Sequence, residues 1–177
     1  MDNKILRWEL IGMIFIILVG SLFHFVFELS GNFPPIGAIA AVNESVWEHL
    51  KLGFWPLVFF LIIEYKFIKD KAKNIGLAKL LASIIIILTI IIIFYSYTAI
   101  LGEDNLIIDI LSFVIAIILG QLVSYKLLSS PKLPNWVNSI SWILFIIIGV
   151  LFVAFTYFPP KLPLFKDPIT GLYGIID

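Results

Sequence analysis

The sequence predicts an all-α integral membrane protein built as a bundle of five transmembrane helices. Its 177 residues are 61% hydrophobic and only 14% charged, which is far more apolar than a soluble domain. Several apolar runs reach the roughly 20 residues that a helix needs to cross a bilayer. Short polar, proline-rich or glycine-containing segments separate these runs. We therefore predict a single transmembrane domain over residues 1–177.

Each predicted span corresponds to one apolar run. The first run follows Lys4 and Arg7 and is too long for a typical signal peptide, so we interpret it as a retained membrane helix. A polar motif precedes the second run, a lysine-rich loop precedes the third, and an acidic turn precedes the fourth. The predicted spans are residues 5–28, 52–68, 78–101, 106–128 and 137–158, with a tail over residues 159–177.

The lysines indicate the orientation of the bundle. Positive residues lie at the N-terminus and in two of the connections, at Lys66, Lys69, Lys71, Lys73, Lys79, Lys126 and Lys132. The turn over residues 102–105 has two acidic residues and no cation. Lys and Arg prefer the cytoplasmic side of a membrane. We therefore predict a multi-pass protein of the cell membrane with a cytoplasmic N-terminus and an extracytoplasmic C-terminus.

Four segments then share the outer face: the first loop, the motif, the acidic turn over residues 102–105 and the tail. The first loop, residues 30–42, is apolar but too short to span, so it is either re-entrant or lies on the lipid headgroups. Asn43 or Ser45 can cap the helix that follows, and Ser45 has capping-box spacing to Glu48. The motif over residues 43–51 should therefore form a polar amphipathic helix leading into the second span. The proline-rich tail is too apolar to extend into water. We predict an extracytoplasmic cap made of the loop, the motif helix and the tail.

The motif concentrates the chemistry of the chain. It reads Asn43-Glu44-Ser45-Val46-Trp47-Glu48-His49-Leu50-Lys51. Ionisable groups at a membrane are costly and therefore mark functional sites. On one continuous helix, Glu44, Glu48 and Lys51 would share a face. If the site is catalytic, the expected catalytic residues are Glu44, Glu48 and His49.

A second polar pair, His24 and Glu28, ends the first span. The sequence has two histidines, His24 and His49, and both are predicted at the same depth beside glutamates. Imidazole and carboxylate suit zinc, iron or manganese, so one hypothesis is a divalent-metal site of His24, Glu28, Glu48 and His49. Three alternatives stay open: a metal-free acid–base site, binding or ion passage without chemistry, and ion pairs that only fasten the cap.

Further polar side chains at the same end are expected to contact a ligand. Asp109 heads a stripe of small and polar residues on the fourth span and should face into the bundle, where Tyr97 can supply a hydroxyl. The expected ligand-binding residues are Asn43, Ser45, Lys51, Tyr97, Asp109 and Asp167. The predicted partner is the lipid bilayer. A small polar ligand or a cation is a second candidate partner, and whether the protein forms an oligomer is left open. Nothing indicates nucleic-acid binding.

The motif also carries a resemblance. The string VNESVWEHLKL over residues 42–52, followed by Phe54-Trp55-Pro56, resembles the hallmark of an uncharacterised family of small bacterial polytopic membrane proteins. His24 with Glu28, and the tail string PLFKDPITGLYGI, resemble the same family. The resemblance implies a multi-helix membrane protein and assigns no activity.

The polar residues at the outer end favour a binding site over a transport or accessory role. The favoured function is a His/Glu site at the outer membrane boundary that binds a cation, a polar ligand or a lipid headgroup, with hydrolytic chemistry left open. The alternative is a non-enzymatic permease or an accessory subunit of a membrane complex, and a permease of five spans without an internal repeat would need to oligomerise.

Overall fold

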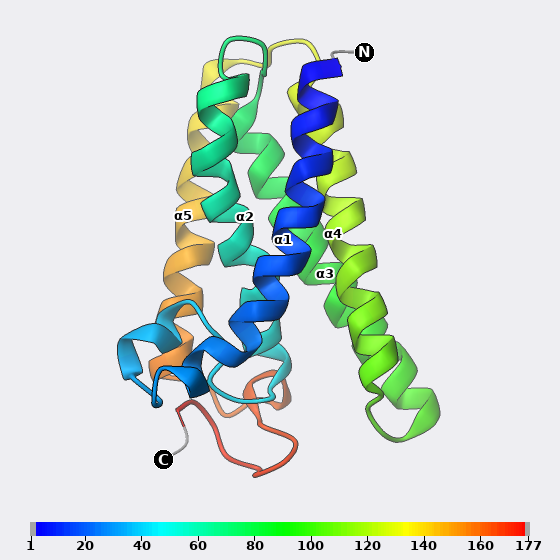
Figure 1. Cartoon of the computed structure of the whole chain (residues 1–177), viewed down its shortest axis with the longest axis vertical. Coiled ribbons are helices and arrows are strands. Elements are labelled where there is room, and N and C mark those ends of the chain that lie inside the picture. The colour runs from blue at the N-terminus through cyan, green and yellow to red at the C-terminus, as the bar shows by residue number, and fades with distance from the viewer. Residues whose placement is uncertain (1–2, 176–177) are drawn as a thin grey trace.

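The computed structural model describes residues 3–175, and its regular secondary structure in that range is helical. Five α-helices within this range are long and apolar enough to cross a membrane. They are α1 (Asn3–Leu29), α2 (Val46–Ile68), α3 (Ile75–Leu101), α4 (Leu106–Leu128) and α5 (Asn135–Tyr157). Two short 3₁₀ helices, η1 (Pro34–Ala38) and η2 (Pro163–Phe165), lie between and after them. The predicted five-helix membrane bundle is confirmed (Figure 1).

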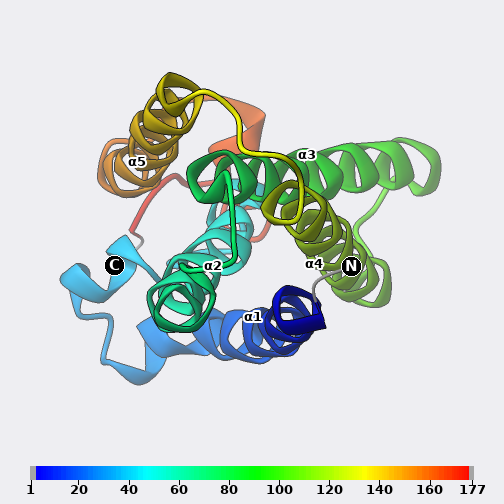
Figure 2. The same ribbon diagram turned by 90° about the horizontal axis from the view of Figure 1, so that it is seen from above.

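Helix α2 forms the centre of the bundle. Viewed along the bundle, it lies among α1, α3 and α5 (Figure 2), and its side chains Phe54, Leu57 and Phe60 are buried. Helices α3 and α4 pair closely, while α5 packs chiefly on α3. The motif helix and the second span form one continuous helix, so the motif is rigidly connected to the core.

The outer helices expose apolar faces suited to lipid. On α1, Ile14, Leu18 and Leu22 follow one another at four-residue spacing, and each is more than half exposed. On α5, Ile146 and Val150 are exposed to the same degree. Helices satisfy their backbone hydrogen bonds internally, as hydrocarbon requires. The surface and the backbone therefore both fit a bilayer environment.

The two ends of the bundle differ. Helix α1 begins at the end formed by the α2–α3 and α4–α5 connections (Figure 1); we call it the lysine end, after Lys66, Lys73 and Lys132. The first loop, the start of α2 and the tail gather at the opposite end, which we call the loop-and-tail end. There Asn43 Nδ2 donates to Gly174 O at 2.8 Å. This hydrogen bond joins the start of the motif to the tail.

A buried ionic cluster joins the helices near the lysine end. Lys79 Nζ on α3 lies 2.9 Å from Glu9 Oε1 on α1 and also pairs with Glu64 on α2. Ser124 Oγ on α4 donates to the same Glu9 oxygen at 2.9 Å. All four side chains are buried. Two carboxylates thus share one ammonium, and the cluster ties four helices together.

Candidate functional site

The site begins at the N-terminus of α2. Ser45 is the N-cap residue, and its Oγ accepts a hydrogen bond from Glu48 N at 3.4 Å, which satisfies a backbone donor that the helix leaves free. The Ser45 N–H in turn donates to Asn43 Oδ1 at 2.8 Å. Asn43 and Glu44 therefore lie before the helix, and the helical spacing starts only after Ser45.

Glu48 and Lys51 form a buried ion pair on α2. Lys51 Nζ lies 2.5 Å from Glu48 Oε2, and it donates to Gly37 O at 2.7 Å and to Thr156 Oγ1 at 2.8 Å. Glu48 Oε2 also accepts a hydrogen bond from Val42 N at 3.0 Å. Both charged side chains are almost fully buried. The pair thus connects the first loop, α2 and the end of α5.

His24, Glu44 and His49 converge beside this pair. The two Nε2 atoms of His24 and His49 lie 3.2 Å apart. Glu44 Oε2 lies 3.4 Å from each of them. The three atoms form a nearly equilateral triangle, and the three side chains are partly exposed to solvent. This group, which we call the His–Glu triangle, contains both histidines of the chain.

A backbone carbonyl orients one of the imidazoles. His49 Nδ1 lies 2.9 Å from Ser45 O, which is one turn earlier on α2. An Nδ1–H at this position donates to the carbonyl and leaves the Nε2 lone pair free, which is the tautomer that a metal ligand requires. The N-cap residue therefore also positions the functional ring.

Glu44 supplies a negative charge to the triangle. Hydrogen bonds with His24 and then His49 hold the pKa of Glu44 well below its usual range, and the nearby imidazoles act in the same direction. Partial burial opposes this lowering but is the smaller effect. Glu44 is therefore a carboxylate at neutral pH.

Gly20 lets α1 and α2 approach each other closely near the His–Glu triangle. A Cβ atom on Gly20 would collide with the backbone carbonyl oxygen of Leu52 and would lie 2.7 Å from Phe113 Cζ. Gly20 is one turn before His24, and Leu52 is three residues after His49. Small residues let membrane helices approach closely. The close approach at Gly20 thus sets the separation of the two imidazoles.

Gly20→Ala is expected to lower the free energy of unfolding by about 1–3 kcal/mol, the usual cost of overpacking a tight contact. The reason is that Leu52 O belongs to a helix backbone and cannot rotate away. Thermal unfolding of the purified protein in detergent measures the effect, with Ser21→Ala as the control because Ser21 is the exposed neighbour on α1. Equal stability of the two variants would contradict the close packing.

A cavity of about 320 Å³ opens beside the triangle. It is lined by His24 and Glu44 of the triangle together with Glu28, Asn32 and Asn43, and by Phe27, Ala41 and Val42. The cavity offers carboxylate and amide groups to a small polar molecule. Glu28, expected as a metal ligand, lines this cavity, while Glu48 is engaged in the buried pair.

The other expected ligand-binding residues lie in separate places. Tyr97 OH donates to Asp109 Oδ1 at 2.6 Å and accepts a hydrogen bond from Asn105 N at 3.1 Å, so these side chains fasten the α3–α4 turn. The Asp167 carboxylate accepts hydrogen bonds from Ile169 N and Thr170 N of its own tail. The structure therefore gives these residues local structural bonds.

Two features of the site have little or no signal in the sequence. Thr156 bonds the Glu48–Lys51 pair from the far end of the chain, and no spacing rule connects it to the motif. Gly20 has a weak signal, because it is a glycine one turn from a histidine in an otherwise apolar helix. The Ser45 carbonyl that orients His49 follows from the helix start.

Comparison with known proteins gives one match. The model of a family described as "Family of unknown function (DUF6512)" matches residues 1–175, which confirms the resemblance to an uncharacterised family. No curated protein and no solved structure gives a significant match.

Proposed function

Because the chain belongs to this family of unknown function, we propose its role from the site itself: a membrane protein that binds a divalent metal ion on His24, Glu44 and His49. Zinc is the ion that the site fits best. The observation that carries the proposal is the His–Glu triangle, with its separations of 3.2, 3.4 and 3.4 Å. Asn43, Glu28 and the adjacent cavity would receive the ligand.

The separations fit a tetrahedral ion. Zinc holds imidazole nitrogen and carboxylate oxygen at about 2.0–2.2 Å, so two of its tetrahedral ligands lie about 3.3–3.5 Å apart. An octahedral ion with similar bond lengths would bring neighbouring ligands to about 3.0 Å. The triangle matches one face of a tetrahedron more closely than one face of an octahedron. With a proton on Nδ1 that donates to Ser45 O, His49 would present its Nε2 lone pair to the ion.

The ligand set indicates which chemistry the site can support. Two histidines and one glutamate are the ligands of catalytic zinc sites, which keep the fourth position open. When bound, such an ion lowers the pKa of its water and polarises carbonyl or phosphoryl oxygens. In this proposal Glu28, Asn32 and Asn43 orient a small polar substrate or a lipid headgroup for hydrolysis. The lysine pattern supports an extracytoplasmic position for the site.

A non-enzymatic permease or accessory subunit is the alternative function. A permease needs a polar path between the two ends of the bundle. Between the Glu48–Lys51 pair and Glu64, α2 contributes the buried apolar side chains Phe54, Leu57 and Phe60. These fill the centre of the bundle, which favours a site confined to one end.

The test is zinc binding by the purified protein in detergent after treatment with a chelator. The wild type is expected to bind one zinc per chain, and His24→Ala, Glu44→Ala and His49→Ala should each lower the affinity about 100-fold or more, since even second-shell changes cost up to about that factor. Zinc at a concentration 100 times Kd should stabilise the wild type by about 2.7 kcal/mol. Titration calorimetry and thermal unfolding measure the two effects.

Two controls sharpen the test. Glu28→Gln removes a carboxylate from the same cavity but outside the triangle, so it should bind zinc like the wild type. Cobalt in place of zinc should give the intense visible absorption of a four-coordinate ion. A wild type that binds no zinc, or triangle variants that bind it as tightly as Glu28→Gln does, would exclude the proposed site.

A further inference from the structure

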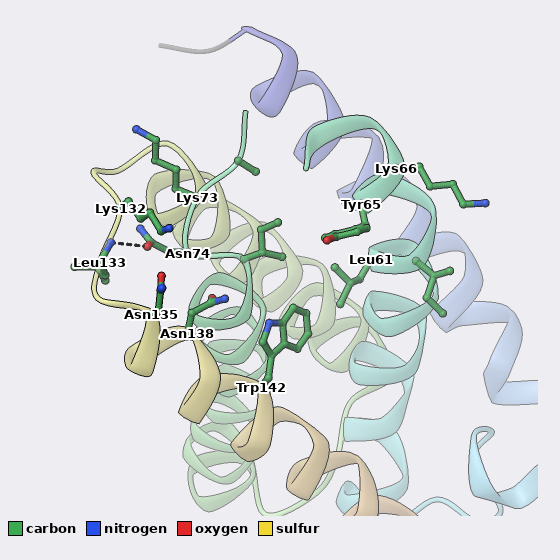
Figure 3. A pocket seen from close by; sticks show the side chains of 13 residues that line it. Leu61, Tyr65, Lys66, Lys73, Asn74, Lys132, Leu133, Asn135, Asn138 and Trp142 are labelled. Carbon is green, nitrogen blue, oxygen red and sulfur yellow. Dashed lines mark hydrogen bonds between the residues drawn. The ribbon is translucent and has the colours of Figure 1, made fainter. Parts of the chain in front are cut away.

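A second cavity lies at the lysine end, far from the His–Glu triangle. Its volume is about 780 Å³, within the range of pockets that hold small molecules. Its walls come from the end of α2, the α2–α3 connection, the start of α3, the α4–α5 connection and the start of α5. Figure 3 shows these walls around an open space. The proposed metal site does not use this cavity.

Hydrogen bonds hold the cavity in its shape. Asn74 Nδ2 donates to Pro131 O at 3.0 Å and to Ser130 Oγ at 2.9 Å, while its Oδ1 accepts a hydrogen bond from Leu133 N at 2.9 Å (Figure 3). Lys73 N also donates to Leu128 O at 2.9 Å. The two connections are therefore joined, which brings together the segments that carry Lys73 and Lys132.

The lining divides into an apolar wall and a positive rim. The wall includes Leu61 and Ile62 on α2 and Trp142 on α5. The cations that line the cavity are Lys66, Lys73 and Lys132, and no acidic residue lines it within the described range 3–175. In Figure 3, Lys73 and Lys132 extend from the two joined connections, and Lys66 extends outward from α2.

The position of the cavity along the bundle fits a lining with an apolar wall and a positive rim. Helix α2 ends at Ile68, α3 begins at Ile75 and α5 begins at Asn135, so the cavity lies where three membrane-spanning helices meet the headgroup layer. In a bilayer spanned by these helices, the apolar wall would face the hydrocarbon and the lysines would face the headgroups. Exposed Ile62, at 60%, and exposed Tyr65, at 47%, leave the cavity open toward the lipid.

We propose that this cavity binds an anionic phospholipid. The phosphate group lies between Lys73 and Lys132, with Lys66 at the far rim, and the acyl chains lie along Leu61, Ile62 and Trp142. Basic pockets between membrane helices recognise such headgroups. A zwitterionic lipid would bring its own cation toward the lysines, and free phosphate would leave the apolar wall uncovered.

Lipid binding to the purified, delipidated protein tests the proposal. Native mass spectrometry should detect one bound phosphatidylglycerol per chain, in preference to phosphatidylcholine. The double variant Lys73→Gln, Lys132→Gln should lower the affinity for phosphatidylglycerol about 25-fold, since each lysine near an anionic headgroup contributes about fivefold. The matched control is Lys69→Gln with Lys126→Gln, which removes the same charge from exposed residues at the same end and should bind like the wild type.

A second measurement tests the apolar wall. Phosphatidylglycerol with brominated acyl chains quenches tryptophan on contact, so it should quench the wild type more strongly than Trp142→Phe. Three results would overturn the proposal. They are equal binding of phosphatidylglycerol and phosphatidylcholine, an equal loss of lipid affinity in the two double-lysine variants, and competition by inorganic phosphate at the concentration of the lipid. None of these measurements depends on zinc or on the His–Glu triangle.

Discussion

Lys79→Met is expected to lower the free energy of unfolding by about 3–5 kcal/mol, the typical cost of removing one partner from a buried ion pair. Lys79 is 1% exposed, and both of its partners, Glu9 and Glu64, are fully buried. The substitution leaves two carboxylates close together without a counter-charge and with little access to water. Their mutual repulsion adds to the cost of burying each of them.

Unfolding of the purified protein by heat or by a denaturing detergent measures this loss. Lys69→Met is the control, because Lys69 is exposed at the same end. Adding Glu9→Gln and Glu64→Gln to Lys79→Met should restore much of the stability, since buried ion clusters can be replaced by neutral groups at little cost. Wild-type stability of Lys79→Met would show that the cluster does not contribute.

Glu48→Gln is expected to lower the stability by a similar amount, about 3–5 kcal/mol, at the other end of the bundle. Lys51 Nζ would keep its bonds to Gly37 O and Thr156 Oγ1 but would lose its anionic partner, Glu48. Val42 N would also lose a charged acceptor. Zinc affinity should fall as well, because the loop that Val42 anchors leads directly to Glu44.

The pattern across two measurements identifies the role of Glu48. In a structural role, Glu48→Gln lowers the melting temperature, and Glu48→Gln combined with Lys51→Met regains stability. In a ligand role, Glu48→Gln abolishes zinc binding while the melting temperature stays near that of the wild type. Glu103→Gln, at an exposed position in the α3–α4 turn, controls for the removal of a charge. We expect the first pattern.

The five-helix bundle could be predicted from the sequence because each span is recognised from its own residues alone. Apolar runs long enough to cross a bilayer are a property of single segments, and five of them became five helices. The N-cap at Ser45 was likewise visible, since the capping signal lies within four residues. The pairing of helices is not local, and the stripe of small and polar residues after Asp109 was only a weak signal for it.

The site was predicted in part. The meeting of His24 and His49 followed from their equal depth, and the structure places their Nε2 atoms 3.2 Å apart. The different positions of Glu44 and Glu48 were not predicted. The prediction assumed helical spacing over the whole motif, whereas α2 begins only at Val46. Glu44 precedes the N-cap and reaches the histidines, whereas Glu48 lies within the first turn and meets Lys51.

The cluster of Glu9, Glu64 and Lys79 has a consequence for the biosynthesis of the protein. The ribosome completes α1 and α2 before α3, so the two carboxylates reach the membrane ahead of the ammonium that neutralises them. A charge held in a membrane without a partner is costly. An assembly of α1 and α2 alone is therefore an unfavourable intermediate of membrane insertion. Lys79 on α3 supplies the counter-charge, so the ion pairs can form only once three helices are in the membrane.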